Sequence, residues 1–120
     1  MLVVEDVDLN QLLMKAILQE FGFGFDLASN GKIAIEKLKQ DNFDIILMDL
    51  QMPVMDGFSA TNYIRNVMKS TIPIIALTAD VTTVDLKKCQ AAGMNDYISK
   101  PLNEKLLYNK IINLVSSEVF

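Results

Sequence analysis

The feature that most constrains this sequence is a fivefold alternation between short apolar runs and longer segments in which apolar residues recur every three or four positions. The runs have the length of strands, and the periodic segments have the spacing of helices. Strands are expected at residues 1–4, 23–28, 43–48, 72–77 and 96–99, and helices at about 9–21, 31–39, 58–68, 82–92 and 104–115. We therefore expect five strand–helix units in succession, without a linker or repeat between them.

Strict alternation of strands and helices favours an α/β fold in which helices cover both faces of a parallel sheet. Right-handed crossovers leave few topologies. At 120 residues the expected one is the (βα)5 flavodoxin-like doubly wound parallel sheet with strand order 2-1-3-4-5. The length suits a single domain over residues 1–120. Because the first strand starts at Met1 itself, this domain is expected to be either excised from a longer protein or preceded by a very short N-terminus.

The first helix carries several local signals. Six apolar residues at steps of three and four are expected to form one face of it: Leu9, Leu12, Leu13, Ala16, Ile17 and Phe21. Asp8, followed three residues later by Gln11, has the spacing of a capping box. Gly22 suits the position after the helix end, where a left-handed backbone is common. Residues 29–31 are expected to cap the second helix.

Composition and charge exclude several classes of function. The net charge of −4 and the scattered Lys and Arg residues give no basic footprint for nucleic acid. The apolar runs are too short to span a bilayer, so no membrane contact is expected from this segment, although a parent protein could carry an anchor elsewhere. Cys89 is the only cysteine and no signal peptide is visible, which favours a reducing, cytoplasmic setting. The chain has no histidine, which excludes His-based general catalysis and a role as phosphohistidine carrier.

Chemically active side chains follow four of the five expected strands. Glu5 and Asp6 end the first strand, Asp49 the third, Thr78 the fourth and Lys100 the fifth. In the order 2-1-3-4-5 these strands are neighbours, and the active groups of such sheets collect at the carboxyl ends of the strands. We therefore expect three carboxylates, a hydroxyl and an ammonium group to meet in one pocket.

This combination of groups suits phosphoryl transfer assisted by a metal ion. Crowded carboxylates repel one another unless a cation neutralises them, and Mg²⁺ prefers one or two carboxylates together with water and phosphate oxygens. One carboxylate can then act as a nucleophile towards phosphorus. Lys100 offers a positive charge to the phosphoryl oxygens, and Thr78 offers a hydrogen-bond donor. Such catalysis consists mostly of positioning and charge stabilisation, so it needs no histidine.

Each of these residues also has an ordinary explanation. Glu5 and Asp6 could form a solvated or helix-capping acidic turn, and Asp49 could cap the following loop. Thr78 could bond only to its local backbone, and Lys100 could be a solvated charge at a strand end. Their joint occurrence at four suitable strand ends favours the functional interpretation.

Four sequence segments resemble those of response-regulator receiver domains, in the same order along the whole chain. They are residues 3–6 (VVED), 48–57 (MDLQMPVMDG), 76–79 (ALTA) and 91–101 (AAGMNDYISKP). Together with Asn10, the first and last segments are most similar to receivers of hybrid sensor histidine kinases. The resemblance implies a phosphorelay receiver, which accepts a phosphoryl group from a phosphohistidine donor onto Asp49 and then switches conformation or passes the group on. It also implies a domain that catalyses its own phosphorylation and dephosphorylation without being a stand-alone enzyme, with a hybrid histidine kinase as a candidate parent.

The resemblance implies roles for individual residues as well. Asp49 would be the phosphoacceptor, and Thr78 and Lys100 would contact the phosphoryl group. Mg²⁺, for which Mn²⁺ can substitute, would be held by Glu5, Asp6, Asp49 and the main-chain carbonyl of Gln51. The bond between Lys100 and Pro101 would be cis. Many receivers have Asp where this chain has Glu5, so direct or water-mediated metal binding by Glu5 stays open.

Two further implied roles concern signalling. Thr78 and Tyr97 would form the conformational switch, and the alternative for Tyr97 is an edge-strand aromatic that packs on the last helix. The partner would be a histidine kinase or a histidine phosphotransfer protein. It would dock on a surface that includes Leu9, Asn10, Leu13 and Pro101, whereas the alternative for Leu9 and Leu13 is that both face the core.

Three other functions are less consistent with the sequence. A dehalogenase-type phosphatase also uses an Asp nucleophile and Mg²⁺, but it needs a second Asp two residues later, where this chain has Gln51, and it places the pair after the first strand. A flavodoxin needs a hydroxyl- and glycine-rich phosphate loop after the first strand, where this sequence is acidic. A degenerate receiver would act only as a docking module; the complete set of acids, Thr78 and Lys100 argues against it, and a phosphorylation assay decides the question.

Overall fold

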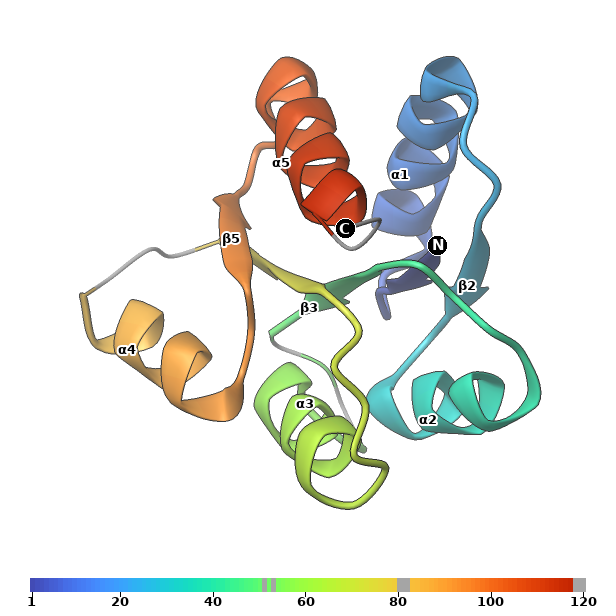
Figure 1. Cartoon of the computed structure of the whole chain (residues 1–120). Coiled ribbons are helices and arrows are strands. Elements are labelled where there is room, and N and C mark those ends of the chain that lie inside the picture. Colours follow the sequence, from blue (N-terminus) through green and yellow to red (C-terminus); the bar gives the residue numbers. More distant parts are fainter. Residues whose placement is uncertain (51, 53, 80–82, 118–120) are drawn as a thin grey trace.

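The computed structural model of the chain describes residues 1–50, 52, 54–79 and 83–117. Five parallel strands form one sheet in the order β2-β1-β3-β4-β5 (Figure 1). The strands are β1 (Leu2–Val4), β2 (Asp26–Ala28), β3 (Ile46–Asp49), β4 (Ile74–Thr78) and β5 (Asp96–Ser99). The helices are α1 (Asp8–Phe21), α2 (Gly31–Gln40), α3 (Gly57–Asn66), α4 (Thr83–Ala92) and α5 (Glu104–Ser117). The predicted (βα)5 architecture and its strand order are therefore confirmed.

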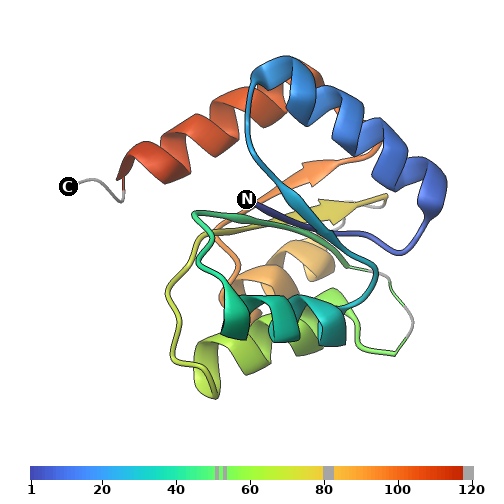
Figure 2. The same ribbon diagram turned by 90° about the vertical axis from the view of Figure 1, so that its right-hand side faces the viewer.

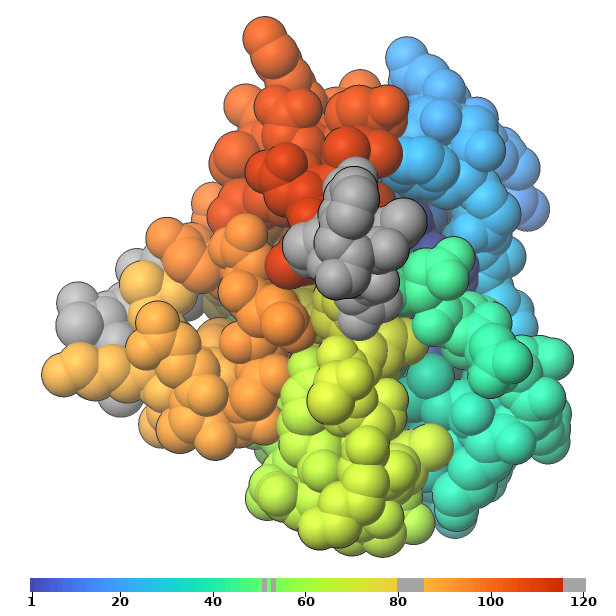
Figure 3. All heavy atoms as spheres, viewed as in Figure 1, coloured from blue at the N-terminus to red at the C-terminus, as the bar shows by residue number. Residues whose placement is uncertain are grey.

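The sheet lies between two helical layers. Helices α1 and α5 cover one face, and α2, α3 and α4 cover the other (Figure 1). In the space-filling view, α2, α3 and α4 follow one another as neighbours on the second side of the sheet (Figure 3). Successive strand residues alternate between the two apolar clusters: Val3 packs beneath α1 and α5, whereas Leu2 and Val4 pack on the opposite side. Because β1, β3 and β4 are covered on both faces, all their residues are buried, which explains their continuous apolar sequences.

Three of the strands begin later than their apolar runs. Strand pairing in β2 and β3 begins three residues after the start of the predicted segments, and pairing in β4 begins two residues after it. The skipped residues include Phe23, Phe25 and Phe43, which pack against the two apolar clusters without joining the sheet. Their apolar character therefore reflects burial outside the hydrogen-bonded ladder.

The start of α1 differs from the prediction. No side chain caps this helix, whose N-cap residue is Val7, so the predicted capping box of Asp8 and Gln11 is wrong. The Gln11 side chain instead donates a hydrogen bond of 2.6 Å to the main-chain oxygen of Glu5. Gly22 does adopt the predicted left-handed conformation, with φ +80°, and its N–H closes the C-terminal end of α1.

The buried face of α1 also differs from the prediction. Met14 and Leu18 are its buried residues, whereas Leu9 and Leu13 are 64% and 56% exposed. Leu12 and Ala16 are exposed as well. Apolar residues occupy more than one side of this helix, so periodicity alone could not decide which stripe packs on the sheet. Met14 and Leu18 belong to the apolar cluster formed with the sheet and with Leu107 and Ile111 of α5, so tertiary packing selects this stripe.

The other helix ends follow their local signals. Asn30 caps α2 by accepting a hydrogen bond of 2.9 Å from the Ile33 N–H, as expected for residues 29–31. Asp56 caps α3 in the same way, with the Ser59 N–H at 2.8 Å. Among the described residues, no helix is both long enough and apolar enough to cross a membrane.

Candidate phosphoryl-transfer site

The carboxyl ends of β1, β3, β4 and β5 lie at one edge of the sheet, on the right in Figure 2. Strand pairing aligns Val4 with Met48 and Thr78 with Ser99. The polar residues at or just after these strand ends therefore emerge at about the same level. The expected convergence of groups from four strands is present in the structure.

Three carboxylates come together at this edge. Glu5, Asp6 and Asp49 each place one oxygen so that these atoms lie within 4.8 Å of one another. Glu5 is only 2% exposed, and Asp49 is also buried. Two acidic groups that are both buried and adjacent repel each other strongly unless a positive charge is close.

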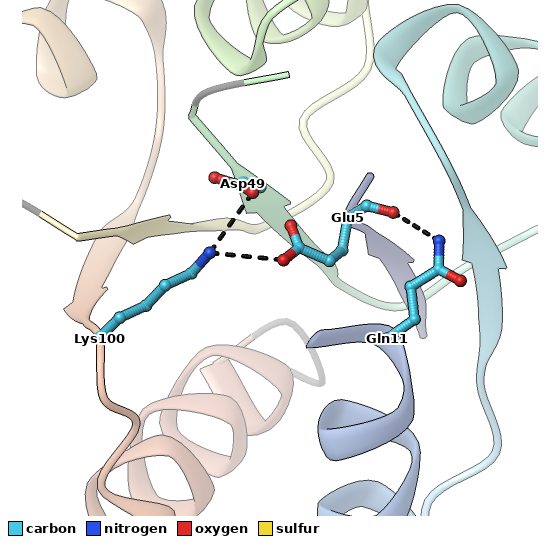
Figure 4. A network of polar contacts seen from close by, with 4 residues as sticks. All are labelled: Glu5, Gln11, Asp49 and Lys100. Carbon is cyan, nitrogen blue, oxygen red and sulfur yellow. Dashed lines mark hydrogen bonds and ion pairs between the residues drawn. The ribbon is translucent and has the colours of Figure 1, made fainter. Parts of the chain in front are cut away.

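Lys100 supplies one such positive charge. Its Nζ lies 3.4 Å from Glu5 Oε1 and 3.4 Å from Asp49 Oδ2, so one ammonium group bridges the two buried carboxylates (Figure 4). The backbone of Lys100 is held as well, because its N–H donates a hydrogen bond of 2.8 Å to the carbonyl of Thr78. The bond between Lys100 and Pro101 is cis, as predicted. The Gln11 side chain supports the same region by holding the main chain of Glu5 (Figure 4).

The electrostatic environment of Glu5 opposes its ionisation. The pKa of Glu5 is raised from 4.5 to about 7; burial is the largest cause, and the neighbouring Asp49 contributes through a hydrogen bond and through its charge. Asn10 and Lys100 act in the opposite direction. Glu5 Oε2 is buried and has no hydrogen-bond partner among the described residues. A buried oxygen without a partner, within a group of three carboxylates, fits a hard dication such as Mg²⁺.

Two hollows adjoin these charged groups. A cavity of about 190 Å³ is lined by Asp6, Asn10, Asp49, Thr78 and Lys100 among others. The other, of about 380 Å³, lies between α1 and α5 and has mainly apolar walls that include Leu13 and Pro101. The smaller cavity therefore brings together two of the predicted metal ligands, Asp6 and the expected phosphoacceptor Asp49, with the predicted hydrogen-bond donors Thr78 and Lys100. Asn10 and Lys100 line both hollows, so the two hollows are adjacent.

The predicted docking residues lie beside the site and not in the core. Leu9 and Leu13 are exposed on α1, so the alternative in which both face the core is wrong. Pro101 is exposed on the segment that follows β5. Leu13 and Pro101 line the larger hollow, whose walls also include Asn10.

Tyr97 lies on the edge strand β5 and is not among the residues that line the smaller cavity. Its half-buried ring packs against the apolar cluster on the α4 side of the sheet. Lys110 of α5 places its Nζ 4.9 Å from the centre of the ring and forms an ion pair of 2.7 Å with Asp96. The contact with the last helix that the packing alternative predicts is therefore present, and the switch role of Tyr97 stays a prediction.

One predicted ligand of the site is not described by the structure, and one close contact of the site was not predicted. The expected metal ligand on the main chain of Gln51 lies outside the described residues. The unpredicted contact is made by Gly57, whose N–H bonds to the Leu50 carbonyl at 3.2 Å; a Cβ added to Gly57 would collide with the main chain of Asp49 and Leu50. The only sequence signal for this contact is the position of Gly57 at the end of the segment 48–57.

A family model described as the response regulator receiver domain matches residues 1–112. The chain is 41% identical over 120 residues to hybrid signal transduction histidine kinase M of Dictyostelium discoideum, an alignment that covers 95% of this chain and 5% of that protein. It is 38% identical over 112 residues to the autoinducer 2 sensor kinase/phosphatase LuxQ of Vibrio vulnificus, with 93% of this chain and 13% of that protein covered. The chain therefore spans only a small part of these relatives.

Two solved structures are also similar to this chain. One is the receiver domain of a sensor histidine kinase from Pseudomonas aeruginosa with a magnesium ion in its active-site cleft (TM-score 0.87, 38% identity, 96% of this chain and 95% of that chain covered). The other is the receiver domain of Ssk1 from Saccharomyces cerevisiae, in complex with the histidine phosphotransfer protein Ypd1 (TM-score 0.92, 32% identity, 99% and 90% covered). The topology, the acidic edge of the sheet and the match over residues 1–112 agree, and the chain belongs to the response regulator receiver domain family.

Proposed function

We propose that this domain accepts a phosphoryl group from a phosphohistidine protein onto Asp49 in a reaction that requires Mg²⁺. The observation that carries the proposal is the group of Glu5, Asp6 and Asp49, whose oxygens lie within 4.8 Å and two of which face the Lys100 ammonium at 3.4 Å. Few structural roles call for three carboxylates in so small a space. A phosphorelay receiver uses them as a nucleophile and a metal site.

Glu5, Asp6 and Asp49 would hold the metal ion, with Mn²⁺ as a substitute and the main-chain carbonyl of Gln51 as a further predicted ligand. The Mg²⁺ bound in the Pseudomonas receiver supports this assignment. When bound, the ion would supply positive charge to the carboxylates and to the phosphoryl oxygens. Glu5 Oε2, buried and without a partner among the described residues, would gain one by direct or water-mediated coordination.

The residues of the chain would perform the transfer itself. An oxygen of Asp49 forms a bond to phosphorus while the nitrogen–phosphorus bond of the donor breaks, and the electron pair of that bond stays on the imidazole nitrogen. Lys100 already lies beside Asp49, so it would hold the incoming phosphoryl oxygens without a large movement. Thr78 lines the same cavity and would donate a hydrogen bond from its hydroxyl group to a phosphoryl oxygen.

The proposed partner is a histidine kinase or a histidine phosphotransfer protein. A similar yeast receiver is solved in complex with such a protein, which supports this class of partner. The exposed apolar side chains of Leu9 and Leu13, together with Asn10 and Pro101, would form the docking surface beside Asp49. After transfer, the domain would either switch conformation through Thr78 and Tyr97 or pass the phosphoryl group on.

The wider context of the domain is also a proposal. Its relatives include hybrid histidine kinases, so we assign this receiver to a hybrid kinase as its parent. Within such a parent the domain would catalyse its own phosphorylation and dephosphorylation. A cytoplasmic location remains a prediction that rests on the single, buried Cys89.

The acceptor can be tested with a small phosphodonor. Acetyl phosphate and Mg²⁺ should add one phosphoryl mass to the wild-type protein, as measured by intact mass spectrometry. Asp49→Asn should abolish this labelling, because the amide is not a nucleophile towards phosphorus. Labelling of Asp49→Asn at the full level would reject Asp49 as the acceptor, and an unlabelled wild type would favour a receiver that acts only by docking.

The docking surface needs a separate test. Leu13→Asp should slow transfer from a phosphohistidine donor but leave acetyl phosphate labelling unchanged, because Leu13 is 56% exposed and outside the core. Circular dichroism should show an unchanged fold. Equal loss of both labelling reactions would mean that Leu13 supports the site structurally.

A further inference from the structure

We infer that Lys110 of α5 is a positioning residue for the conformational switch. Its ammonium group holds the ring of Tyr97 in the position seen here and has to release it when the domain is phosphorylated. This inference rests on the proposed function, in which Tyr97 takes part in the switch. It names a residue outside the acceptor cavity that sets the balance between the two states, and the sequence patterns did not indicate this residue.

Three contacts meet at the start of β5. Asp96 Oδ1 accepts a hydrogen bond of 2.8 Å from the Tyr97 N–H and another of 2.7 Å from Lys110 Nζ. The same Nζ lies over the Tyr97 ring, 4.9 Å from its centre. A cation at this distance is attracted by the face of an aromatic ring. The carboxylate of Asp96 thus aims the ammonium group of Lys110 at the ring, and we call these three residues the β5 clamp.

The β5 clamp joins the two sides of the sheet at its edge. Strand β5 is an edge strand, with α5 on one side and α4 on the other (Figure 1). The Tyr97 ring packs against the apolar cluster on the α4 side, whereas α5 packs against the opposite cluster. Lys110 therefore reaches around the open edge of the sheet to the ring. Its side chain is only 20% exposed, and partial removal from water strengthens the attraction between cation and ring.

Tyr97 lies on the same side of the sheet as Thr78, the residue at the end of β4. Strand pairing aligns Ala76 with Tyr97 and Thr78 with Ser99. Because side chains alternate between the two faces, Tyr97 and Thr78 share one face and are separated by about 7 Å along the strands. A movement of the Thr78 hydroxyl towards a phosphoryl oxygen therefore changes the space next to the ring. A hollow of about 140 Å³, lined by Tyr97 and Cys89 among others, also adjoins the ring on the α4 side.

Displacement of the ring would break one contact of the β5 clamp. The main chain of Tyr97 is fixed by the pairing of β5 with β4, so the movement is confined to the ring. A ring that turns away leaves Lys110 paired with Asp96 alone and loses the attraction to the cation. The β5 clamp therefore stabilises the unswitched state. A phosphate mimic that favours the switched state has to overcome this stabilisation, so loss of the clamp should raise its apparent affinity.

The opposite edge of the sheet provides a matched ion pair. At the start of β2, Asp26 Oδ1 accepts hydrogen bonds from the Leu27 N–H at 2.8 Å and from Lys37 Nζ at 2.9 Å. This pair also joins the first residue of an edge strand to a neighbouring helix. Over the described part of the chain, the lysines that lie over aromatic rings are Lys39 and Lys110. Lys37 thus has the ion pair of the β5 clamp without its ring contact.

Three variants test the inference. Lys110→Gln removes the charge but keeps a donor that can reach Asp96, whereas Lys110→Arg keeps a cation suited to both the carboxylate and the ring. Lys37→Gln is the matched control, because it removes the corresponding charge at the other edge of the sheet. The affinity for beryllofluoride in the presence of Mg²⁺ is measured by titration for each protein. In the wild type, nuclear Overhauser contacts between the Tyr97 ring and the Lys110 side chain are recorded with and without the mimic.

We expect Lys110→Gln to bind beryllofluoride about threefold to tenfold more tightly than the wild type, as the loss of a partly desolvated cation–ring contact implies. Lys110→Arg and Lys37→Gln should bind it like the wild type. In a Tyr97→Leu background, Lys110→Gln should have little further effect, because the ring is already absent. The Overhauser contacts should be present in the free wild type and lost with the mimic. Unchanged affinity in Lys110→Gln would overturn the inference, as would an equal gain in Lys37→Gln or in the Tyr97→Leu background.

Failure of the proposed function has a different signature. A wild-type domain that acetyl phosphate does not label and that does not bind beryllofluoride would reject phosphoacceptance itself. A wild type that is labelled at Asp49 and binds the mimic, but keeps the contacts between Tyr97 and Lys110, would retain the acceptor and would reject the inference about Lys110.

Discussion

Glu5 is a residue whose surroundings oppose the charge that its function would use. Burial and the adjacent Asp49 raise its pKa to about 7, and Asn10 and Lys100 compensate only in part. A cation at the acidic group would favour the ionised form of Glu5 and reverse this trend. The free energy of unfolding should therefore depend on pH and Mg²⁺ together.

The pH dependence has a defined sign. In the unfolded chain Glu5 should lose its proton near pH 4.5, whereas in the folded protein it keeps the proton up to about pH 7. Without Mg²⁺, its contribution to stability is thus fully present below pH 4.5 and is lost as the pH rises to about 7. We expect Glu5→Gln to be more stable than the wild type at pH 8 by up to about 3 kcal/mol, and to differ little at pH 4. Urea unfolding at both pH values in the presence of a chelator measures the difference, and an equal pH dependence in the two proteins would contradict it.

At the scale of elements, the start of α3 is pressed against the end of β3. Gly57, the first residue of α3, leaves no room for a Cβ between itself and the main chain of Asp49 and Leu50. The start of α3, which Asp56 caps, is therefore in direct contact with the end of β3, the strand that carries the acceptor. Glycine is required here by packing, since its backbone conformation is not left-handed.

Gly57→Ala should lower the free energy of unfolding by about 1–3 kcal/mol, the usual cost of forcing an extra methyl group into a packed site. It should also slow labelling of Asp49 by acetyl phosphate, because the displaced atoms belong to that residue. Gly24→Ala is the control, since a Cβ there meets nothing within 4 Å. Equal stability of the two variants in urea would show that α3 can shift freely away from β3.

Helix α4 is the element that we expect to move on phosphorylation. Its C-terminal end is tied to α3, because Arg65 Nε donates a hydrogen bond of 2.9 Å to the Gly93 carbonyl. Cys89 is the buried residue among the described side chains of this helix. Elements with few buried contacts open and shift most easily. A displacement should therefore be larger in the helix than at Gly93.

A phosphate mimic should reveal this movement. Beryllofluoride with Mg²⁺ should change the amide signals of β4, α4 and β5 in the wild type, including residues far from Asp49. Thr78→Ala should still bind the mimic but lose most of the distant changes, because the hydroxyl that follows the phosphoryl group is absent. The phosphoryl group needs to favour the switched state by only a few kcal/mol to make it dominant. Changes confined to the cavity in the wild type would indicate a phosphate carrier without a conformational switch.

For the molecule as a whole, Glu5, Asp6 and Asp49 bring three of the acidic residues of a chain with net charge −4 into one small region. Binding of Mg²⁺ to the folded state alone should raise the melting temperature. An ion concentration of ten times the dissociation constant would contribute about 1.4 kcal/mol, equivalent to several degrees for a domain of this size. Stability and signalling chemistry are thus linked through the same three carboxylates.

Asp6→Asn should sharply reduce the shift of melting temperature with millimolar Mg²⁺, because it removes one of the three clustered carboxylates. Asp44→Asn removes a negative charge from an exposed position just before β3, at the opposite edge of the sheet, and should retain the full shift. Differential scanning fluorimetry with and without Mg²⁺ compares the three proteins. A wild type indifferent to Mg²⁺, or equal shifts in both variants, would argue against a metal site at Asp6.

Much of the fold and the candidate site could be predicted from the sequence, because both depend on local patterns. Apolar periodicity and strand length predicted the five strand–helix units, and topology rules predicted the order of the strands in the sheet. The polar residues at the strand ends then predicted that Glu5, Asp49, Thr78 and Lys100 would converge. These inferences need only the rule that parallel strands end at one edge. The cap at Asn30 and the left-handed Gly22 were likewise predictable from neighbouring residues.

The tertiary structure decided what depends on contacts between distant elements. Leu9 and Leu13 have the same periodicity as core residues, but Met14 and Leu18 are the residues that pack with the sheet and α5. Gln11 has capping spacing, but its side chain bonds to the main chain of Glu5. The raised pKa of Glu5 also arises from burial and from residues distant in the sequence. Burial, charge proximity and steric fit are properties of residues brought together in space, and a periodicity along the chain cannot express them.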